Sequence, residues 1–350
     1  MTREKWLIDP AELDEFQREI LDLGINDSYV IKGCAGSGKT ILALHRANDI
    51  YIDALVEGRA KANFSMVVYT VPLKEFIRSG IMELDFPVQQ IIHWEKWDES
   101  LIDYVIVDEA QDFSKDRIDA FNNAKIKSIM LYGDSQQQLY AEGMSIEGIA
   151  EYLSIPQKEL TKNYRLPKEI ASFASHLCED KDLESKCIKV GSDKPRIKKL
   201  ASWQKELDYI IEEIKTRNYT DVAILVPYNL KRSGGIKNNL NHSVEQIHEY
   251  FQNVGFIHEC KMNDKNITFE LAFDSDNPKV MTFHSSKGLQ FETVFIPFCD
   301  YPTHDKWFYD KFQNPFYVAV TRTSKNLYIT YSTRLSQLLD DIPTTKFDLL

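Results

Sequence analysis

A glycine-rich segment has the residue types and the spacing to bind a phosphate chain. The run Gly33-Cys-Ala-Gly-Ser-Gly-Lys39-Thr40 fits the pattern GxxxxGK[ST]. Glycines let backbone N–H groups curl around a phosphate, and a helix that begins at the end of the run adds a favourable dipole. In this pattern the lysine reaches the β- and γ-phosphates, and the threonine hydroxyl ligates Mg²⁺. The run predicts a nucleotide site built from Gly33, Gly36, Ser37, Gly38, Lys39 and Thr40.

Two adjacent carboxylates supply the other half of this chemistry. Asp108 and Glu109 directly follow the apolar run Tyr104–Val107. We expect Asp108 to hold Mg²⁺ with its water shell and Glu109 to polarise the attacking water. Adjacent carboxylates at a strand end fit hydrolysis better than transfer to a bound substrate. Because an Asp-Glu pair alone is more often a turn, this prediction depends on its combination with the phosphate loop.

Both features need parallel strands to position them. The first half alternates β-branched runs with amphipathic stretches; we expect strands at Ser28–Lys32, Ser65–Thr70, Val88–His93, Tyr104–Val107 and Ser128–Tyr132, and helices at Thr40–Val56 and Ser114–Ala124. The second half repeats the alternation, with strands at Asp221–Val226, Lys279–Phe283, Thr293–Pro297 and Asn326–Thr330, and helices at Glu206–Arg217 and Val244–Val254. This order predicts an α/β fold with mostly parallel sheets. A break near Leu153–Pro156 predicts two domains, residues 1–155 and 156–350.

The length and composition of the chain indicate the number of domains and the class of protein. The chain has 350 residues, of which 43% are hydrophobic, so two cored domains are the simplest expectation. It has no apolar run of about 18 residues and begins with charged residues, so we expect neither a membrane helix nor a secretory signal. The 5 cysteines show no CxxC spacing. This argues against a disulfide framework or a structural zinc site and favours a reducing cytoplasm.

The net charge of the chain indicates whether it could bind nucleic acids over a broad surface. With 42 basic and 53 acidic residues, the formal net charge is −11. This argues mildly against a broad surface for polyanions but leaves a narrow basic groove open. The segment Lys186–Lys205 is locally basic. A solvated surface is the favoured interpretation of that segment, and a groove wall is the alternative.

Further motifs, taken in order, make the chain resemble the superfamily 1 helicases of the UvrD/Rep-like branch. They are Phe16-Gln17, Tyr69-Thr70-Val-Pro-Leu-Lys74, Ile92-His93-Trp94, Tyr132-Gly133-Asp134-Ser-Gln-Gln137, Asn163-Tyr164-Arg165, Thr282-Phe-His284-Ser285-Ser-Lys-Gly288-Leu-Gln290-Phe291 and Tyr317-Val-Ala-Val-Thr321-Arg322. Each is weak singly, but the ordered set covers nearly the whole chain. The resemblance implies two tandem RecA-like P-loop NTPase domains with ATP and Mg²⁺ in the cleft between them.

The resemblance also assigns roles at the nucleotide. From the first domain, Gln17 would read adenine, Thr40 and Asp108 would bind the metal ion, and Glu109 and Gln137 would be catalytic. Arg165 and Arg322 would come from the second domain to the γ-phosphate, Tyr164 would stack on adenine, and Gly288 and Gln290 would lie at the nucleotide. A guanidinium is always charged and fork-shaped, which suits developing phosphoryl charge. For each arginine taken singly, a surface salt bridge is the alternative.

The same resemblance implies contacts with single-stranded DNA, with RNA left open. These are Thr70, His93 and Trp94 in the first domain and Thr282, His284 and Ser285 in the second. Hydroxyls and imidazoles contact phosphates, and an aromatic ring offers a base a stacking face. For Trp94 and Trp97, a hydrophobic cover on the core is an equally good interpretation.

Two departures from the family limit the expected activity. The motif at Tyr132–Gln137 usually continues into a Trp-Arg pair, whereas this chain has Leu139–Gly143, with the anion Glu142. Only about fourteen residues lie between His93 and Asp108, too few for the accessory subdomain that the family inserts there. The second accessory subdomain, which normally precedes Thr282, is expected to be missing as well.

Two functions therefore remain open. The first is a helicase-type motor that hydrolyses ATP and moves 3′→5′ on single-stranded DNA. The second is a nucleotide-gated regulatory ATPase that partners another protein, such as a nuclease, in DNA repair or phage defence and unwinds little by itself. A metabolic kinase is disfavoured because the resemblance supplies tandem domains and two arginines in trans.

Overall fold

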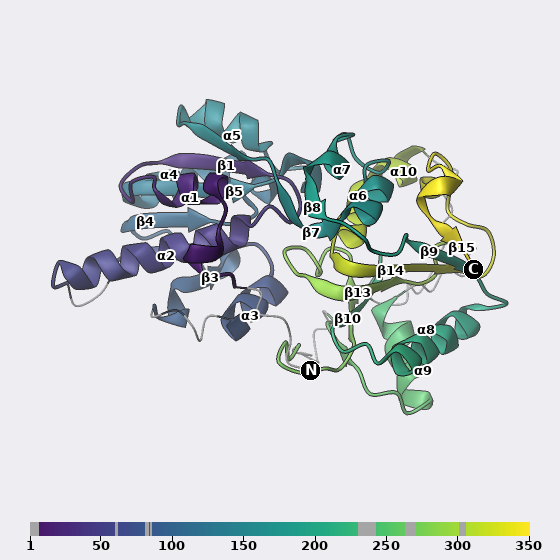
Figure 1. The fold of residues 1–350 in the computed structure, drawn as a ribbon. Helices are drawn as coiled ribbons and strands as arrows, with labels where there is room; N and C mark the ends of the chain where they lie inside the picture. The colour runs from purple at the N-terminus through teal and green to yellow at the C-terminus, as the bar shows by residue number, and fades with distance from the viewer. Residues whose placement is uncertain are drawn as a thin grey trace. The chain divides into compact units, whose positions relative to one another are not determined.

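The structure is a computed structural model that describes residues 7–59, 62–80, 84, 86–229, 243–262, 271–300 and 306–350. Internal contacts divide the chain into two compact units. We call Glu4–Tyr164 the N-terminal unit and Arg165–Leu350 the C-terminal unit. Each has its own parallel sheet with helices packed on it (Figure 1).

The N-terminal unit is built on a six-stranded sheet with the order β3-β2-β4-β5-β1-β6. Its strands are β1 (Tyr29–Gly33), β2 (Phe64–Val68), β3 (Ile91–His93), β4 (Ile102–Val107), β5 (Lys125–Gly133) and β6 (Gln157–Leu160). All of its pairings are parallel. Parallel strands are covered on both faces, which is why their sequences are continuous apolar runs. The carboxyl ends of β1, β4 and β5 consequently meet at one edge of the sheet.

The helices of this unit cover both faces of the sheet. They are α1 (Glu15–Leu21), α2 (Lys39–Val56), α3 (Val71–Gly80), α4 (Lys115–Ala124) and α5 (Ile146–Leu153). Ile31 of β1 packs in one core with Leu42 and Ile50 of α2. Its neighbour Val30 packs in another core with Ile118 of α4. This alternation follows from the two-residue period of a strand, and Figure 1 shows α2 on one side of the sheet and α4 and α5 on the other.

The C-terminal unit has a seven-stranded sheet with the order β11-β12-β10-β13-β14-β9-β15. The strands are β9 (Arg196–Lys199), β10 (Val222–Val226), β11 (Glu259–Cys260), β12 (Lys279–Thr282), β13 (Phe291–Ile296), β14 (Thr323–Tyr331) and β15 (Asp348–Leu349). Their pairings are again parallel. A separate two-stranded sheet joins β7 (Asn163–Pro167) and β8 (Cys187–Lys189). The short strand β11 forms one edge of the larger sheet.

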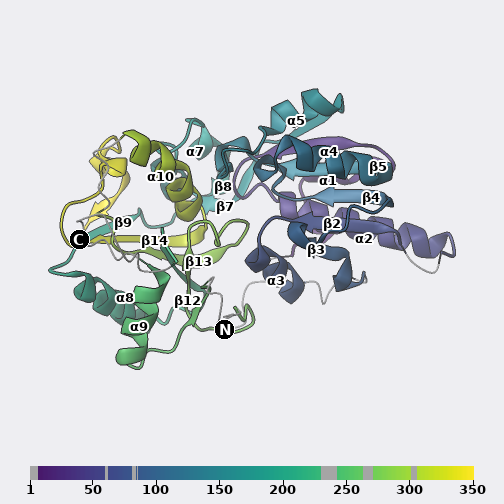
Figure 2. The same cartoon turned by 180° about the vertical axis from the view of Figure 1, so that it is seen from behind.

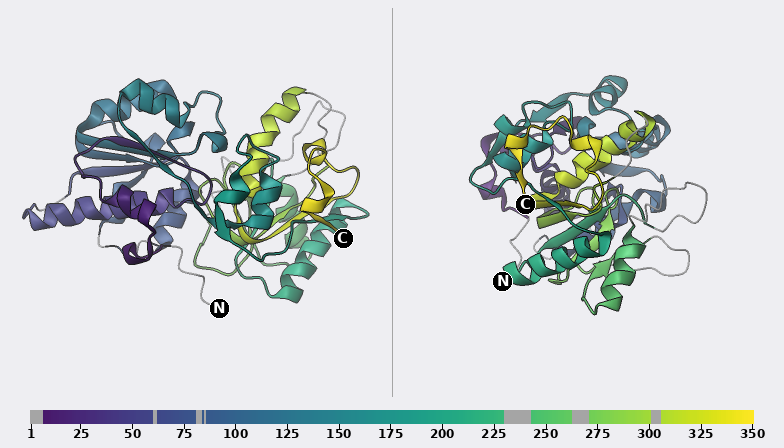
Figure 3. Two further views of the ribbon diagram at one scale, coloured as in Figure 1. Left: turned by 45° about the horizontal axis from the view of Figure 1, so that its top comes forward. Right: turned by 90° about the vertical axis from the view of Figure 1, so that its right-hand side faces the viewer.

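Helices again cover this sheet. They are α6 (Lys168–Ala174), α7 (Leu183–Lys186), α8 (Trp203–Arg217), α9 (Val244–Asn253) and α10 (Lys306–Val320). Leu207 of α8 and Phe251 of α9 share a core with Val222 and Ile224 of β10. Figures 2 and 3 show α8 and α9 on one face of the sheet and α10 on the other. Short 3-10 helices lie at Pro10–Glu12, Val88–Gln90, Trp94–Lys96, Ala110–Asp112, Ser135–Gln137, Gln337–Leu339 and Thr344–Lys346.

The prediction of an α/β fold with mostly parallel sheets is confirmed, but some local predictions are wrong. The strand expected over Val88–His93 begins only at Ile91, because Val88–Gln90 form a 3-10 turn that Gln90 N closes onto Pro87 O, 3.0 Å away. Strand β6 was missed because it is a mostly exposed edge strand whose residues are polar. Since β6 pairs with β1, the compact N-terminal unit extends past the expected break to Tyr164. The assignment of residues 1–155 and 156–350 as RecA-like domains remains a prediction.

Within the described residues, none of the helices has the length and apolar character needed to cross a membrane.

Candidate nucleotide-binding site

The phosphate loop lies where the sequence predicts it, between the end of β1 at Gly33 and the start of α2 at Lys39. Gly36 and Gly38 have φ angles of 77° and 92°, which side chains other than glycine rarely adopt. A Cβ at Gly33 would lie 2.4 Å from Ser37 Oγ, so a larger residue there would displace the Ser37 side chain. The hydroxyl of Ser37 is buried and has no hydrogen-bond partner within the described residues. The loop therefore has the compact shape and the spare polar capacity that a phosphate chain requires.

The lysine of the loop is folded over it. Lys39 Nζ donates to Gly33 O at 2.8 Å and to Cys34 O at 3.0 Å, and the residue is only 7% exposed. Charge-assisted bonds to a phosphate are stronger than bonds to neutral carbonyls. A phosphate at the loop would therefore draw the ammonium group away from these two oxygens.

The expected magnesium ligands are in contact. Thr40 Oγ1 donates to Asp108 Oδ2 at 2.7 Å, from the first turn of α2 to the residue after β4. Asp108 is completely buried. Burial, and then the negative charge of Glu109, raise the pKa of the Asp108 carboxyl above its usual range. A hydroxyl and a carboxylate are the hard oxygen donors that Mg²⁺ prefers. The donor set thus fits Mg²⁺, and a bound cation would relieve the cost of the buried charges.

Gln111 is a site residue that sequence reasoning missed. Its side chain donates from Nε2 to Glu109 Oε2 at 2.7 Å and accepts at Oε1 from Asp134 N at 3.0 Å. It is fully buried. Glu109 itself has a φ of 56°, a left-handed conformation that a non-glycine residue adopts at some cost. Gln111 thereby fixes the proposed catalytic carboxylate to the end of β5. The only sequence signal was its place within Asp108-Glu-Ala-Gln-Asp112.

The next predicted residue, Gln137, lies at the same edge of the sheet. Its Nε2 donates to Asp134 Oδ2 at 2.7 Å, from the short turn that follows β5. Burial raises the pKa of Asp134, and the positive charge of Lys39 opposes the shift. Asp134 thus bonds to Gln137 and lies close enough to Lys39 to feel its positive charge.

The two residues assigned to adenine lie against the phosphate loop. Gln17 Nε2 donates to Ser37 O at 3.1 Å, and Tyr164 N donates to Gly36 O at 2.9 Å. The Tyr164 hydroxyl donates to the carboxylate of Asp14, which also caps α1. Burial and this carboxylate raise the pKa of Tyr164. Asp14 is a second residue that sequence reasoning missed. Its carboxylate accepts from Gln17 N at 2.9 Å and from the Tyr164 hydroxyl, so it positions both residues.

In the C-terminal unit, the residues predicted from the later motifs converge. Arg165 Nε donates to Gln290 Oε1 at 3.1 Å, and Arg165 Nη1 lies 3.5 Å from Thr321 O. Gln290 follows a turn in which Gly288 has a φ of 79°. The amide of Gln290 therefore contacts the arginine of another motif within the same unit.

The second predicted arginine is a buried group. Arg322 is 1% exposed, and its Nε and Nη1 donate to Val318 O at 2.8 Å and Leu289 O at 3.3 Å. Its Nη2 donates to Thr321 Oγ1 at 3.1 Å. Such burial excludes the surface salt bridge that was the alternative for Arg322. The carbonyls hold the guanidinium in one orientation.

The candidate nucleic-acid residues of the N-terminal unit surround a group of aromatic rings. The Trp94 ring lies 5.9 Å from that of Tyr69, which in turn lies 4.6 Å from that of Tyr140. The Arg117 guanidinium lies 5.2 Å from the centre of the Trp94 ring. These rings line a pocket of about 410 Å³ together with the carboxylates Asp112 and Glu142. Arg117 comes from α4 and was not expected at this position.

Three further residues considered as nucleic-acid contacts or core residues have structural roles in the N-terminal unit. Trp97 is buried against Phe121, so the interpretation as a hydrophobic cover is correct for it. His93 is largely buried, and burial lowers its pKa, which leaves it neutral near pH 7. Thr70 Oγ1 accepts from Leu73 N at 3.2 Å and thus helps to begin α3.

The candidates of the C-terminal unit lie after β12. Thr282 Oγ1 accepts from Ser285 N at 3.1 Å and donates to Ser285 Oγ at 3.0 Å. This turn leaves His284 partly exposed beside them. The three residues are therefore grouped within one turn, as the motif predicts.

Part of the basic segment Lys186–Lys205 is paired with nearby acidic residues. Lys186 lies 2.6 Å from the Asp180 carboxylate, and Lys205 lies 3.0 Å from that of Asp208. Arg196 donates to the Tyr328 hydroxyl at 2.7 Å. These local contacts favour the solvated surface over a groove wall.

Comparisons with known proteins find similarity to helicases. Residues 254–334 match the UvrD-like helicase C-terminal domain. The protein R568 of Acanthamoeba polyphaga mimivirus, named as a candidate ATP-dependent DNA helicase, is 25% identical over 256 residues, or 65% of this chain and 34% of that protein. The Gabija protein GajB of Bacillus cereus (strain VD045) is 40% identical over 63 residues, or 17% of this chain and 12% of that protein. This chain thus spans about a third or less of the length of either relative.

Among solved structures, arterivirus nonstructural protein 10, a helicase, aligns with 90% of this chain and 61% of that chain, at 16% identity and a TM-score of 0.45. Residues 254–334 are thus similar to the C-terminal domain of UvrD-like helicases, and the longer match to R568 is to a protein named as a DNA helicase.

Proposed function

We propose that this chain is an ATP-dependent nucleic-acid motor that hydrolyses ATP and translocates on single-stranded DNA, in the 3′→5′ direction that the resemblance implies. The observation that carries the proposal is the contact between Thr40 Oγ1 and Asp108 Oδ2, 2.7 Å long, at the mouth of the phosphate loop. It joins the two elements that a magnesium-dependent ATPase must bring together, and Glu109 directly follows Asp108 in the chain.

The residues of the N-terminal unit have complementary roles in this proposal. The loop N–H groups and Lys39 bind the β- and γ-phosphates. Thr40 and Asp108 would hold Mg²⁺, which when bound neutralises charge on the phosphates. Glu109, oriented by Gln111, accepts a proton from the attacking water. Burial of these carboxylates strengthens each electrostatic interaction because little water screens it.

The two arginines of the C-terminal unit complete the proposed site. Arg165 and Arg322 supply positive charge to the γ-phosphate as it is transferred. The guanidinium of Arg322 is bonded to backbone carbonyls, so it would exchange these bonds for the γ-phosphate, to which a charge-assisted bond is stronger. Thr70, His93, Trp94, Thr282, His284 and Ser285 are the proposed contacts to the strand that moves.

The experiment that tests this proposal is the ATP hydrolysis rate with and without polynucleotides. The purified chain is assayed alone, with single-stranded DNA and with single-stranded RNA, over a series of salt concentrations. We expect strong stimulation by DNA that declines steeply with salt, because binding to phosphates releases counterions. Hydrolysis that no polynucleotide changes at any salt concentration would contradict the motor.

One observation favours a second function, a nucleotide-gated regulatory ATPase that partners another protein such as a nuclease. The aromatic pocket contains Asp112 and Glu142, near the point where related helicases have a Trp-Arg pair. Carboxylates at this position disfavour a nearby DNA phosphate, in agreement with the net charge of −11. An ATP hydrolysis rate that neither DNA nor RNA changes, but that Lys39→Ala abolishes, would favour this function. The regulatory ATPase would then act in DNA repair or phage defence.

A further inference from the structure

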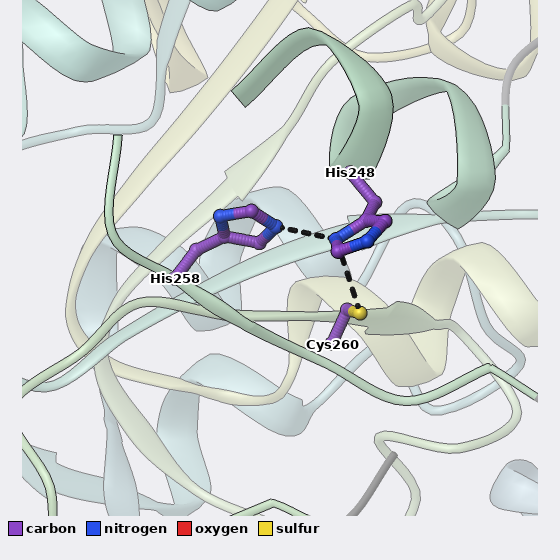
Figure 4. Close-up of side chains that lie close together, drawn as sticks. All are labelled: His248, His258 and Cys260. Atoms are coloured by element: carbon purple, nitrogen blue, oxygen red, sulfur yellow. Dashed lines mark hydrogen bonds between the residues drawn. The ribbon is translucent and has the colours of Figure 1, made fainter. Parts of the chain in front are cut away.

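Three side chains with metal-binding donor atoms meet in the C-terminal unit, outside the residues assigned to the nucleotide. They are His248, His258 and Cys260, and their donor atoms all lie within 4.8 Å of one another. Figure 4 shows the His258 ring and the Cys260 thiol both directed at the His248 ring. His248 Nδ1 lies 2.8 Å from His258 Nε2 and 3.5 Å from Cys260 Sγ.

The backbone explains why these three meet. His258 directly precedes β11, and Cys260 is its second residue, so the two are separated by one residue of extended chain and share a face. His248 comes from α9, which packs beside β12, the strand that pairs with β11. The cluster therefore joins a helix to an edge strand of two residues.

One imidazole is already oriented as a ligand. His258 Nδ1 lies 2.9 Å from Phe256 O, and because a carbonyl only accepts, this nitrogen carries the proton. The lone pair of His258 Nε2 then points towards His248. A backbone carbonyl on the other ring nitrogen is the usual outer partner of a metal-bound histidine. His258 therefore already has the tautomer in which Nε2 is able to bind a metal ion.

The cluster is partly enclosed by the protein. Cys260 is buried, and both histidines are half-buried. Phe251, whose ring lies 5.1 Å from that of His258, forms part of an apolar wall.

The spacing also matches a tetrahedral zinc site. With zinc bonds of about 2.0–2.1 Å to nitrogen and about 2.3 Å to sulfur, two ligands are about 3.3 Å apart if both are nitrogens and about 3.6 Å if one is sulfur. The observed nitrogen–sulfur distance of 3.5 Å already agrees. The two nitrogens, 2.8 Å apart, need to separate by only about half an ångström.

We propose that His248 Nδ1, His258 Nε2 and Cys260 Sγ bind one Zn²⁺, with water as the fourth ligand. On binding, the thiol proton of Cys260 leaves to solvent as the zinc–sulfur bond forms, and the proton on His248 Nδ1 transfers to Nε2. An imidazole and thiolate donor set selects zinc over Mg²⁺ and Ca²⁺, which take oxygen ligands. The absence of CxxC spacing concealed this site, because its ligands come from a helix and a strand.

The proposed zinc ion would stabilise β11, the edge strand of the sheet in the C-terminal unit. Strand β11 contributes only Glu259 and Cys260 to the ladder, so few backbone hydrogen bonds hold it. Its neighbour β12 leads into Thr282, one of the proposed nucleic-acid contacts. Zinc would link β11 to α9 and so lower the rate at which amides of residues 244–262 exchange with solvent.

The test measures zinc in the full chain and is independent of ATP hydrolysis. The purified protein is loaded with zinc sulfate, desalted, and assayed for metal by mass spectrometry. We expect about one zinc per chain, and at least a tenfold lower content in Cys260→Ser and His248→Gln. Matched controls are Cys178→Ser and His176→Gln, which remove a cysteine and a histidine elsewhere in the same unit and should retain zinc. The variant Lys39→Ala should also retain zinc, which separates this proposal from the proposed function.

A second measurement needs only the unmodified chain, in case the variants do not fold. Cobalt(II) replaces zinc in such sites and reports a coordinated thiolate by an intense charge-transfer absorption in the near ultraviolet. We expect this absorption on titration with cobalt chloride, its loss on addition of zinc, and faster amide exchange in residues 244–262 when the metal is removed. A folded chain that retains no zinc and gives no such absorption, or a Cys260→Ser variant that retains zinc fully, would overturn the proposal.

Discussion

The hydroxyl of Thr40 and the carboxylate of Asp108 form a hydrogen bond of 2.7 Å that connects the start of α2 to the end of β4. These residues are far apart in sequence, and β5 lies between β1 and β4 in the sheet. The contact is direct only because parallel strands end at a common edge. It marks the position that we propose for a metal-bound nucleotide in the N-terminal unit.

The first prediction follows from this contact. In Asp108→Asn one charged oxygen donor is lost, so we expect ATP turnover to fall by at least about 100-fold and the Mg²⁺ requirement to rise. Thr40→Ser keeps the hydroxyl and should stay within a few-fold of the unmodified chain. Turnover measured over a Mg²⁺ titration checks this, and removal of Mg²⁺ by EDTA should stop hydrolysis. An Asp108→Asn variant with normal Mg²⁺ dependence would exclude this pair as the metal site.

The second prediction concerns the general base. Glu109→Gln removes the proton acceptor, and we expect turnover to decrease by about 10²–10⁴-fold while ATP binding is retained. Gln111→Ala removes one hydrogen bond to the Glu109 carboxylate and should lower turnover by a smaller factor. Steady-state rates and equilibrium binding of a fluorescent ATP analogue separate the two effects. Glu151→Gln, an exposed acid on α5, is the matched control. Unchanged turnover in Glu109→Gln would show that another group activates the water.

These site residues illustrate how far the sequence is predictive. The phosphate loop was predictable because its glycines, lysine and threonine are contiguous and their chemistry depends on local backbone shape. Gln111 was not predictable, because its role arises only when β4 and β5 place Glu109 and Asp134 on either side of it. The same limit concealed the cluster of His248, His258 and Cys260.

The strands likewise include some that the sequence predicts and one that it does not. Apolar runs such as Tyr104–Val107 predicted buried strands, because strands covered on both faces must be apolar. Strand β6 has the sequence Gln157-Lys-Glu-Leu160, which gives no such signal, and it is formed by pairing with β1. Edge strands are thus specified by their neighbours more than by their own residues.

The third prediction tests the role of the C-terminal unit. Arg322→Lys keeps the positive charge but loses the fork that binds Val318 O and Leu289 O. We expect ATP binding within a few-fold of normal and turnover lower by about 10³-fold or more. Arg334→Lys, an exposed position in the same unit, should have no effect. Binding and turnover are measured on the same preparations after thermal melting confirms folding. Normal turnover in Arg322→Lys would remove this arginine from the catalytic site.

The fourth prediction is a pH dependence of stability in the C-terminal unit. Glu206 is fully buried, where Thr330 Oγ1 and Phe298 N donate to its carboxyl at 2.6 and 2.8 Å. Burial raises the pKa of Glu206 to about 7. An unfolded chain has an ordinary glutamate pKa of about 4.3, so between these values the folded state binds more protons. The free energy of unfolding should therefore fall as pH rises from about 4.5 to about 7, by on the order of 3 kcal/mol.

Urea unfolding at a series of pH values measures this dependence. In Glu206→Gln the slope over this range should become shallower, because the amide keeps an acceptor oxygen but does not titrate. Glu212→Gln, an exposed position on the same helix, should leave the slope unchanged. If Glu206→Gln and the unmodified chain show the same slope, Glu206 is not the titrating group.

The most direct measurement of the central claim is phosphate release from ATP by the unmodified chain and by Lys39→Ala, side by side, in the presence of Mg²⁺ and single-stranded DNA. The loop lysine is expected to be indispensable, so the unmodified chain should turn over ATP continuously and Lys39→Ala should not exceed the background. Equal rates for the two proteins, or no hydrolysis by a folded unmodified chain, would contradict a motor that is driven from this phosphate loop.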